Sequence, residues 1–366
     1  MPPSTAIITG GCGFVGHHVV EHCLAVTDWN LIVLDSLAYS SHSGLRLEDA
    51  QVLHSPRVQF YTWDLSYPLS PGLKHLLQEA DLILHIAAQS HVDDSIADPR
   101  STIRNNVMST VEMLELAREL TPRLRCFLMM STDETYGPVE VGDAGFVETS
   151  RHQPSNPYSA SKSASEKVAF AYWRTYGVPV VTVNAMNIFG ERQHVEKFIP
   201  KVLSYLLQGK TVPIHTNDRK EPGSRHYIHA RNVADALVFL TTRGQPGETY
   251  HIEGEEVVDN LSMAQFLSQQ VDQPLQVKLE ASPKSRPGHD LHYNLNGSKL
   301  YALGWRCPKT FWASLTKMTQ WTLQNPVWLE EHVTRKTLEA HRDKNVALGT
   351  TETSASSTVG REPSQE

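Results

Sequence analysis

Two acidic side chains directly follow an apolar stretch of the chain. Residues 126–130 are apolar, and Ser131 and Thr132 lead from them to Asp133 and Glu134. If the apolar stretch is a strand of an open parallel sheet, the pair lies beyond the carboxyl end of that strand, where such sheets bind ligands. Two adjacent carboxyls in an enclosed site would raise one pKa and so provide one acid and one base. A solvated turn is the alternative interpretation.

A tyrosine and a lysine occur further along the chain. Tyr158 and Lys162 are four positions apart, so on a helix both point to one face. A neighbouring ammonium stabilises a phenolate, which predicts a lowered pKa for Tyr158 and a base that works near neutral pH. Two acids together with an activated tyrosine exceed the acid-base groups that a simple dehydrogenase needs.

The N-terminal glycines are typical of a dinucleotide site. A short strand is predicted at 6–9, and Gly10, Gly13 and Gly16 follow it at three-residue intervals, before a helix at 17–26. Such glycines let the backbone turn tightly and approach a pyrophosphate at a helix N-terminus. A glycine turn that serves packing alone is the alternative.

An acidic residue at the end of the second predicted strand indicates which dinucleotide is bound. The strand at 31–34 ends at Asp35, where a carboxylate would bind ribose hydroxyls and repel the 2′-phosphate of NADP. The sequence therefore predicts NAD. The other residues expected at the cofactor site are Phe14, Val15, Asp64, Leu65, Ala87 and Ala88, with a turn role as the alternative for Asp64.

Strands and helices alternate as far as about residue 185, which predicts an α/β fold with a doubly wound parallel (Rossmann) sheet. The further strands are expected at 58–63, 81–86, 126–130 and 178–183, and two long helices at 103–120 and 159–176. Asn105 and Asn106 are interpreted as cap residues of the first helix or as polar groups of the cofactor site.

After residue 185 the pattern loosens into a smaller substrate-binding portion. We expect residues 1–185 to form mainly the NAD-binding domain and 186–335 mainly the nucleotide-sugar portion, with the chain free to cross between them. Residues 343–366 are predicted to be a disordered tail, since they are rich in Ser, Thr and Glu and poor in apolar side chains.

The composition narrows the class of protein. The chain has 366 residues, 40% of them hydrophobic and 20% charged, with a net charge of −7. Nothing here favours a surface for nucleic acid. The four cysteines lack the spacing of metal ligands and the density of a disulfide framework. No apolar run approaches the roughly 20 residues of a membrane span. A cytoplasmic protein that contacts neither nucleic acid nor membrane is expected.

These motifs together resemble the extended short-chain dehydrogenase/reductase superfamily and, within it, most closely the dTDP-glucose 4,6-dehydratases. The glycines and the Tyr158/Lys162 pair specify only the superfamily. The run Thr132-Asp133-Glu134 is the specific part, because relatives that epimerise or decarboxylate usually lack the aspartate. Supporting segments lie at 85–93, 193–197 and 286–293.

The resemblance implies a lyase reaction with internal hydride transfer. Tyr158 would take the proton of the sugar's 4-hydroxyl while hydride leaves carbon 4 for NAD, and Thr132 would hydrogen-bond the 4-oxygen. Glu134 would then remove the proton on carbon 5, and protonated Asp133 would give a proton to the departing 6-hydroxyl. Hydride would return to carbon 6, so NAD should stay bound.

The resemblance also implies substrate contacts and a homodimer. The helices at 103–120 and 159–176 would pair with those of a second subunit. For single loop arginines or asparagines, a surface role is the alternative. The residues implied for the nucleotide sugar are Ser90, His91, Asn187, Glu196, Lys197, Arg225, Asn260, Arg286 and His289.

Several positions depart from the family pattern around the expected sugar or base pocket. Asp94 and Asn184 stand where arginines are usual, and Gln89 stands where an acid is common. Ile188 and Phe189 replace asparagine and tyrosine. The reacting groups are intact, so dTDP-glucose is expected and UDP-glucose stays open.

Two alternative functions stay open from sequence alone. A nucleotide-sugar 4-epimerase needs Tyr158 and NAD but no acid pair. A non-catalytic NAD-binding regulator would keep the fold, although such proteins commonly lose the tyrosine or the lysine, and both are present here.

Overall fold

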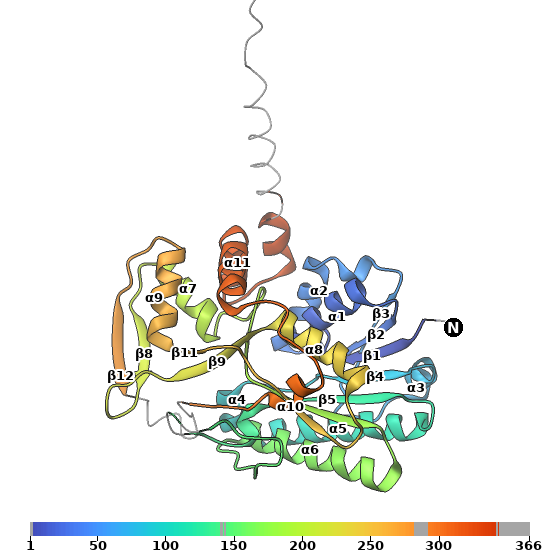
Figure 1. The fold of residues 1–366 in the computed structure, drawn as a ribbon. Coiled ribbons are helices and arrows are strands. Elements are labelled where there is room, and N and C mark those ends of the chain that lie inside the picture. Colours follow the sequence, from blue (N-terminus) through green and yellow to red (C-terminus); the bar gives the residue numbers. More distant parts are fainter. Residues whose placement is uncertain (1–2, 140–141, 143, 282–291, 342, 344–366) are drawn as a thin grey trace, which may run out of the picture.

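A seven-stranded parallel sheet forms the centre of the protein in a computed structural model that describes residues 3–139, 142, 144–281, 292–341 and 343. The strand order is β10-β6-β5-β4-β1-β2-β3, and Figure 1 labels β5, β4, β1, β2 and β3 of this sheet. The strands are β1 (Thr5–Thr9), β2 (Asn30–Asp35), β3 (Val58–Thr62), β4 (Leu82–His85), β5 (Cys126–Thr132), β6 (Val180–Ala185) and β10 (Thr249–Ile252). The predicted doubly wound α/β fold is confirmed.

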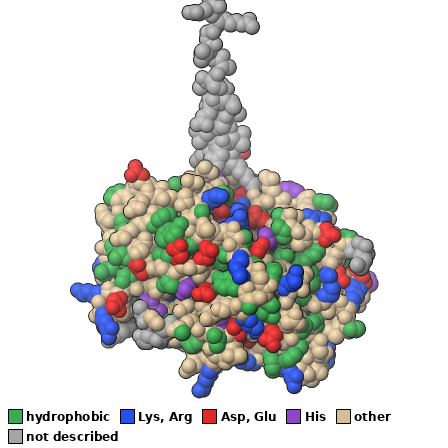
Figure 2. Space-filling view, viewed as in Figure 1, with side chains coloured by type: hydrophobic (Ala, Val, Ile, Leu, Met, Phe, Trp, Pro, Cys, Tyr) green, Lys and Arg blue, Asp and Glu red, His purple; other side chains and the backbone are tan. Residues whose placement is uncertain are grey.

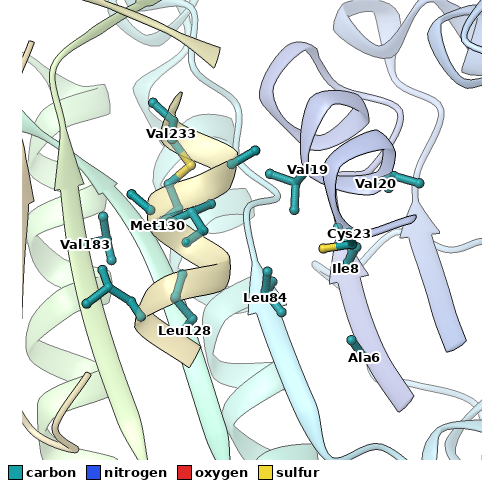
Figure 3. Packing of buried hydrophobic residues seen from close by; sticks show 14 of the residues in the cluster. Ala6, Ile8, Val19, Val20, Cys23, Leu84, Leu128, Met130, Val183 and Val233 are labelled. Carbon is teal, nitrogen blue, oxygen red and sulfur yellow. The ribbon is translucent and has the colours of Figure 1, made fainter. Parts of the chain in front are cut away.

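Helices bury both faces of this sheet, which explains why its strands are continuous apolar runs rather than alternating ones. All seven residues of β5 are buried. On one face pack α1 (Phe14–Val26) and α8 (Ala230–Arg243), and Figure 3 shows Val233 of α8 next to Met130 of the sheet. On the other face pack α3 (Pro71–Leu77), α5 (Pro99–Leu120) and α6 (Pro157–Tyr176).

A smaller portion with its own core lies beside the sheet (Figure 1). It holds a three-stranded sheet of β11 (Val257–Asp259), β9 (Ser224–His229) and β7 (Asn187–Phe189), and the pair β12 (Val277–Ala281) and β8 (Val212–Thr216). Its helices are α7 (Phe198–Leu207), α9 (Asn260–Gln270) and α11 (Phe311–Gln324). The chain crosses back after residue 186, since β10 pairs with β6 and α8 packs on α1.

Short elements complete the fold. They are η1 (Tyr39–Gly44), α2 (Leu45–Asp49), η2 (Val52–His54), α4 (Val92–Ala97), η3 (Asp133–Thr135), α10 (Ser298–Ala302) and η4 (Pro326–Leu329). The tail predicted at 343–366 falls, apart from residue 343, outside the described residues, so it stays a prediction.

The predicted start of the long helix at 103–120 needs correction. Helix α5 begins at Pro99, and Asp98 caps it by accepting a hydrogen bond from Ser101 N at 3.1 Å. Asn105 and Asn106 therefore lie inside the helix rather than at its cap. Asn106 instead holds the loop after β4, because its side chain bonds both the N–H and the carbonyl of Gln89, at 2.8 and 3.0 Å.

The surface in Figure 2 mixes acidic, basic and apolar side chains on the face shown, without a large patch of one charge. Within the described part of the chain, we find no helix that combines the length and the apolar character needed to cross a membrane.

The close approach at Gly16 generates a stability prediction. A Cβ added there would lie 2.0 Å from the carbonyl oxygen of Gly10, so α1 would have to move away from the loop that precedes it. We expect Gly16→Ala to lower the free energy of unfolding by about 1–3 kcal/mol. Thermal melting checks this, with Gly72→Ala as the control, because no atom lies within 4 Å of a Cβ at Gly72. Equal melting temperatures for the two variants would contradict the steric argument.

Candidate active site

The acid pair lies where the central strand β5 gives way to η3. Thr132, the last residue of β5, caps η3: its hydroxyl accepts from Glu134 N at 3.3 Å and donates to Asp133 Oδ1 at 3.0 Å. Because a central strand carries the pair to the carboxyl edge of the sheet, the backbone of both acids is fixed by the fold.

Asp133 is the member of the pair whose pKa is raised. Its side chain is almost completely buried, and Oδ2 has no hydrogen-bond partner. Burial first, and then the charge of Glu134, raise the pKa of Asp133 from 3.8 to about 7. The direction agrees with the prediction that one pKa of the pair rises, and the assignment of Asp133 as the acid stays a prediction.

Glu134 is held by a residue that sequence reasoning missed. Asn156 Nδ2 donates to Glu134 Oε2 at 3.1 Å, while Asn156 Oδ1 caps α6 by accepting from Ser159 N at 2.9 Å. One amide thus ties the base to the start of the helix that carries Tyr158. An asparagine before a proline at a helix start is a cap signal visible in the sequence, but its second partner is not.

Helix α6 brings Tyr158 to the acid pair, and the direction predicted for its pKa is wrong. Burial, then Glu134 and Asp133, raise the pKa of Tyr158, although a side-chain hydrogen bond with Thr132 opposes them. The prediction counted only Lys162. In this structure burial and the charges of the two carboxyls raise the pKa instead, and a neutral phenol results.

Lys162 is also buried, and this lowers its pKa to about 8, while the charge of Glu166 acts to raise it. The lysine is therefore mostly an ammonium at neutral pH, with a margin of only about one pH unit.

A second buried carboxyl, Glu166, lies behind the site and was also missed. It accepts hydrogen bonds from the Ser131 hydroxyl and from Asn184 Nδ2, the latter at 2.9 Å. Asn184 also donates to the carbonyl of Thr132 at 2.9 Å. Glu166 lies four residues after Lys162 and eight after Tyr158, which places it on the same side of α6. This spacing is the sequence signal that could have identified Glu166.

Asn184 therefore needs a second correction. The sequence placed this departure around the sugar or base pocket, but the side chain is completely buried and supports the backbone beneath η3. Asparagine in place of the usual arginine therefore changes the support of the acids. It does not change the side chains that are expected to contact the sugar.

The glycine loop forms a close-packed cradle that fits a dinucleotide. Gly10 has a φ of +70°, and a Cβ there would lie 2.8 Å from Ala87 Cα. Gly13 caps α1 without a side-chain hydrogen bond, so the first N–H groups of the helix, at Phe14 and Val15, are available to an anion.

Asp35 lies beside this loop at the end of β2. It accepts hydrogen bonds from Cys12 N at 2.9 Å and Leu37 N at 2.8 Å, so it fixes the loop. Ala88 is half-buried after β4. The two remaining cofactor predictions, Asp64 and Leu65, find weaker support. Asp64 is exposed and accepts a hydrogen bond from Ser66 N at 2.9 Å, which agrees with the alternative of a turn role. Leu65 packs in the hydrophobic core.

One predicted phosphate ligand lies close to the acids. Arg225 is 8% exposed, its guanidinium lies 4.9 Å from the centre of the Tyr293 ring, and its charge acts to lower the pKa of Asp133. The side chain thus reaches from β9 of the smaller portion toward η3 of the sheet.

Three further predicted substrate residues meet between the two portions. His91 Nε2 lies 3.5 Å from Glu196 Oε2, and Lys197 Nζ lies 3.9 Å from Glu196 Oε1. Asn187 has a buried amide oxygen without a hydrogen-bond partner.

Among the described residues, we find no hydrogen bond or ion pair between the other predicted substrate residues and His91, Glu196 or Lys197. Ser90 is exposed, and Asn260 accepts a hydrogen bond from the Tyr227 hydroxyl at 3.2 Å. Arg286 and His289 lie outside the described residues.

The raised pKa of Asp133 predicts a pH dependence of stability. Its pKa is about 7 in the folded chain and about 3.8 as the ordinary value, so the folded state binds the proton more tightly. This contribution is complete below about pH 4 and is lost as the pH rises through 7, and its upper bound is roughly 4 kcal/mol. Urea unfolding between pH 4 and pH 8 measures it.

Asp133→Asn should remove that slope, whereas the exposed Asp28→Asn should keep it. Parallel stability curves for the wild type and Asp133→Asn would contradict the assignment of the proton.

Most of the chain matches a known protein family. Residues 7–318 match the family model described as GDP-mannose 4,6 dehydratase. A dTDP-glucose 4,6-dehydratase of Escherichia coli K12 is 34% identical over 347 residues, which cover 88% of this chain and 94% of that protein. A trifunctional UDP-glucose 4,6-dehydratase of Arabidopsis thaliana is 34% identical over 332 residues, covering 89% of this chain and 48% of that protein.

A solved structure is similar to this chain in both fold and sequence. The dTDP-glucose 4,6-dehydratase of Streptomyces venezuelae, crystallised with NAD bound, has a TM-score of 0.80 and 34% sequence identity. The alignment covers 89% of this chain and all of that one.

Proposed function

The chain belongs to the GDP-mannose 4,6 dehydratase family, and we propose that it is an NAD-dependent nucleotide-sugar 4,6-dehydratase, a lyase. It would convert dTDP-glucose, or a related nucleoside diphosphate glucose, to the 4-keto-6-deoxy sugar. The observation that carries this proposal is the pair of buried Asp133 and half-buried Glu134 next to Tyr158. Oxidation at carbon 4 needs only the tyrosine, whereas loss of water also needs an acid and a base. A 4-epimerase would have no use for the pair.

NAD fits the cradle of Gly10, Gly13 and Gly16, with Asp35 at the adenosine ribose. NAD bound there would supply the hydride acceptor for carbon 4 and the hydride donor for carbon 6, and its positive charge would favour the phenolate of Tyr158. The chain's own residues perform the proton transfers.

Three side chains would divide these transfers. Tyr158 would take the proton of the 4-hydroxyl, while the hydroxyl of Thr132 bonds the oxygen that becomes a ketone. That ketone acidifies the proton on carbon 5. Glu134 would remove this proton and return one to carbon 5 once hydride has reached carbon 6, and Asn156 keeps this base in place. Asp133 gives its proton to the departing 6-hydroxyl, which its pKa of about 7 allows at neutral pH.

The smaller portion would hold the nucleoside diphosphate. Arg225 is suited to phosphate oxygens because its guanidinium can donate two parallel hydrogen bonds. His91, Asn187, Glu196 and Lys197 would line the rest of the pocket. Ser90, Asn260, Arg286 and His289 complete the proposed set by analogy with the family. This keeps the proposed division into a mainly NAD-binding part, 1–185, and a mainly sugar-binding part, 186–335.

Product analysis tests the function. The purified chain is incubated with dTDP-glucose and, separately, with UDP-glucose, and the 4-keto product is detected by its chromophore in alkali. The product of a dehydratase carries a methyl group at carbon 6, which proton NMR detects, and an epimer does not. Silence with both sugars, or an epimer as the product, would overturn the proposal.

Two substitutions should separate the steps. Asp133→Asn removes the acid but not the tyrosine, so it should slow loss of water by about 10²-fold or more while NADH still forms at 340 nm. Tyr158→Phe should abolish both. Equal effects of the two substitutions on NADH formation and on water loss would contradict the roles given.

Glu166 should set the pH range of the enzyme through Lys162. Glu166→Gln removes a negative charge that acts to raise the pKa of Lys162, so that pKa should fall below about 8. The alkaline limb of the kcat profile should move to lower pH, with little change in KM. The exposed variant Glu119→Gln serves as control. An unshifted alkaline limb in Glu166→Gln would show that the carboxyl has only a packing role.

We also propose a homodimer that pairs α5 and α6 with the same helices of a second subunit. These helices pack side by side, and together they expose large apolar side chains, each more than 40% exposed: Ile103, Met108, Phe170 and Tyr176. Such a surface is typical of a protein interface.

Light scattering tests the dimer. The wild type should show twice the chain mass of 41.0 kDa, and Met108→Lys with Phe170→Lys should shift it to the monomer. Leu76→Lys on α3, an equally exposed apolar position, should leave the dimer intact. A monomeric wild type would contradict the proposal.

A cytoplasmic location is proposed because all four cysteines are unpaired, as expected in a reducing compartment. Cell fractionation checks this, and recovery in an oxidising compartment would contradict it.

A further inference from the structure

Two adjacent histidines follow the last glycine of the dinucleotide loop, and the proposed reaction uses neither. His17 and His18 lie in the first turns of α1, and both side chains have no exposed surface. Complete burial of a histidine requires that its ring nitrogens find partners, because an unpartnered buried polar atom has lost its hydrogen bonds to water.

Hydrogen bonds fix which nitrogen of each ring carries the hydrogen. His17 Nδ1 lies 3.2 Å from the carbonyl oxygen of Gly13, and His18 Nε2 lies 3.2 Å from the carbonyl oxygen of Glu191. A carbonyl oxygen only accepts, so both of these nitrogens must donate. The opposite nitrogens, His17 Nε2 and His18 Nδ1, therefore carry lone pairs in the neutral rings. Both are buried without a hydrogen-bond partner.

A carboxylate oxygen lies close to these two nitrogens. Glu21 Oε2 lies 3.5 Å from His18 Nδ1, is buried and has no hydrogen-bond partner. His17, His18 and Glu21 each offer one ligand atom, and the three atoms lie within 4.8 Å of one another. Three acceptors thus face one another, and together they need a cation.

We propose that His17, His18 and Glu21 bind one Zn²⁺ ion. Two imidazole nitrogens and one carboxylate oxygen are a donor set that zinc uses in proteins, with water in the fourth position. The hydrogen bonds from the opposite ring nitrogens to backbone carbonyls are the outer contacts that metal-binding histidines usually make. The side chain of Glu21 is 26% exposed, which gives an ion and its water a route from solvent.

The neighbouring arginines do not occupy the carboxylate oxygen that the ion needs. Arg192 lies 3.8 Å from the other oxygen, Glu21 Oε1, and its Nε bonds Asp49 at 2.6 Å. Arg231 approaches Glu191 at 3.7 Å. The carboxylates of Asp49 and Glu191 therefore offset these two guanidinium charges, and Glu21 can serve the ion.

The ion would have a structural role between the two portions of the chain. His18 bonds the backbone of Glu191, and a Cβ at Gly190 would lie 3.1 Å from His18 Nε2, so the segment after β7 packs directly on this ring. Zinc at His18 would therefore tie α1 of the NAD-binding part to the segment that leads into the sugar-binding part.

Metal titration of the purified full-length chain tests the site. After treatment with a chelator, Co²⁺ should bind and give the visible absorption of a four-coordinate site, and Zn²⁺ should displace it with one equivalent. Because the chain has 18 histidines, weaker binding elsewhere is expected, and the loss of one tight equivalent is the diagnostic result. Glu21→Gln and His18→Gln should each weaken that equivalent at least tenfold.

His22→Gln is the matched control, since His22 lies on the same helix but faces Asp235, at 3.4 Å. It should keep the tight equivalent and the rise in melting temperature that Zn²⁺ causes. Circular dichroism and the content of bound NAD show whether the variants fold. If His18→Gln does not fold, Glu21→Gln alone decides the test. No tight equivalent in the wild type would overturn the proposal, leaving a proton between His18 and Glu21. Unchanged binding by Glu21→Gln would overturn it as well.

Discussion

Burial of Asp133 beside Glu134 is the constraint on which the site depends. Two carboxylates cannot both ionise cheaply where solvent is excluded, so the pair shares its charge unequally and one member keeps its proton. Strand β5 creates this situation because it is covered by helices on both faces and ends directly at the pair. The hydroxyl of Thr132 then holds the side chain of Asp133 and the backbone of Glu134 at this edge. The raised pKa of Asp133 thus follows from the position of two residues in the sheet.

The surrounding elements serve this pair in different ways. Helix α6 presents Tyr158 and Lys162 to it and carries Glu166 behind it, where Ser131 and Asn184 bond that carboxyl. The glycine loop brings the cofactor cradle to the same edge of the sheet. The smaller portion contributes Arg225, whose charge partly opposes the rise in the pKa of Asp133. Support, reaction and substrate binding therefore come from three separate parts of the chain.

Sequence reasoning succeeded where a pattern depends on one element. Apolar runs located the strands of the sheet, and the spacing of Tyr158 and Lys162 placed both on one helix near the acids. It failed where the outcome depends on the sum of several elements. The pKa of Tyr158 rises because the side chain is buried and two carboxyls act on it, and neither of these effects can be read from spacing. Asn156 and Asn184 support the acids through contacts across 22 and 52 residues, and β10 returns to the sheet after a long excursion.

The account centres on one site in which a single sugar is oxidised, dehydrated and reduced without exchange of the cofactor. An isotope experiment tests this most directly: nucleoside diphosphate glucose with deuterium on carbon 4 is converted in ordinary water, and the product is analysed by NMR and mass spectrometry. The account predicts one deuterium in the new methyl group at carbon 6. Deuterium that is lost to solvent, or that remains on carbon 4 of an epimer, would contradict it.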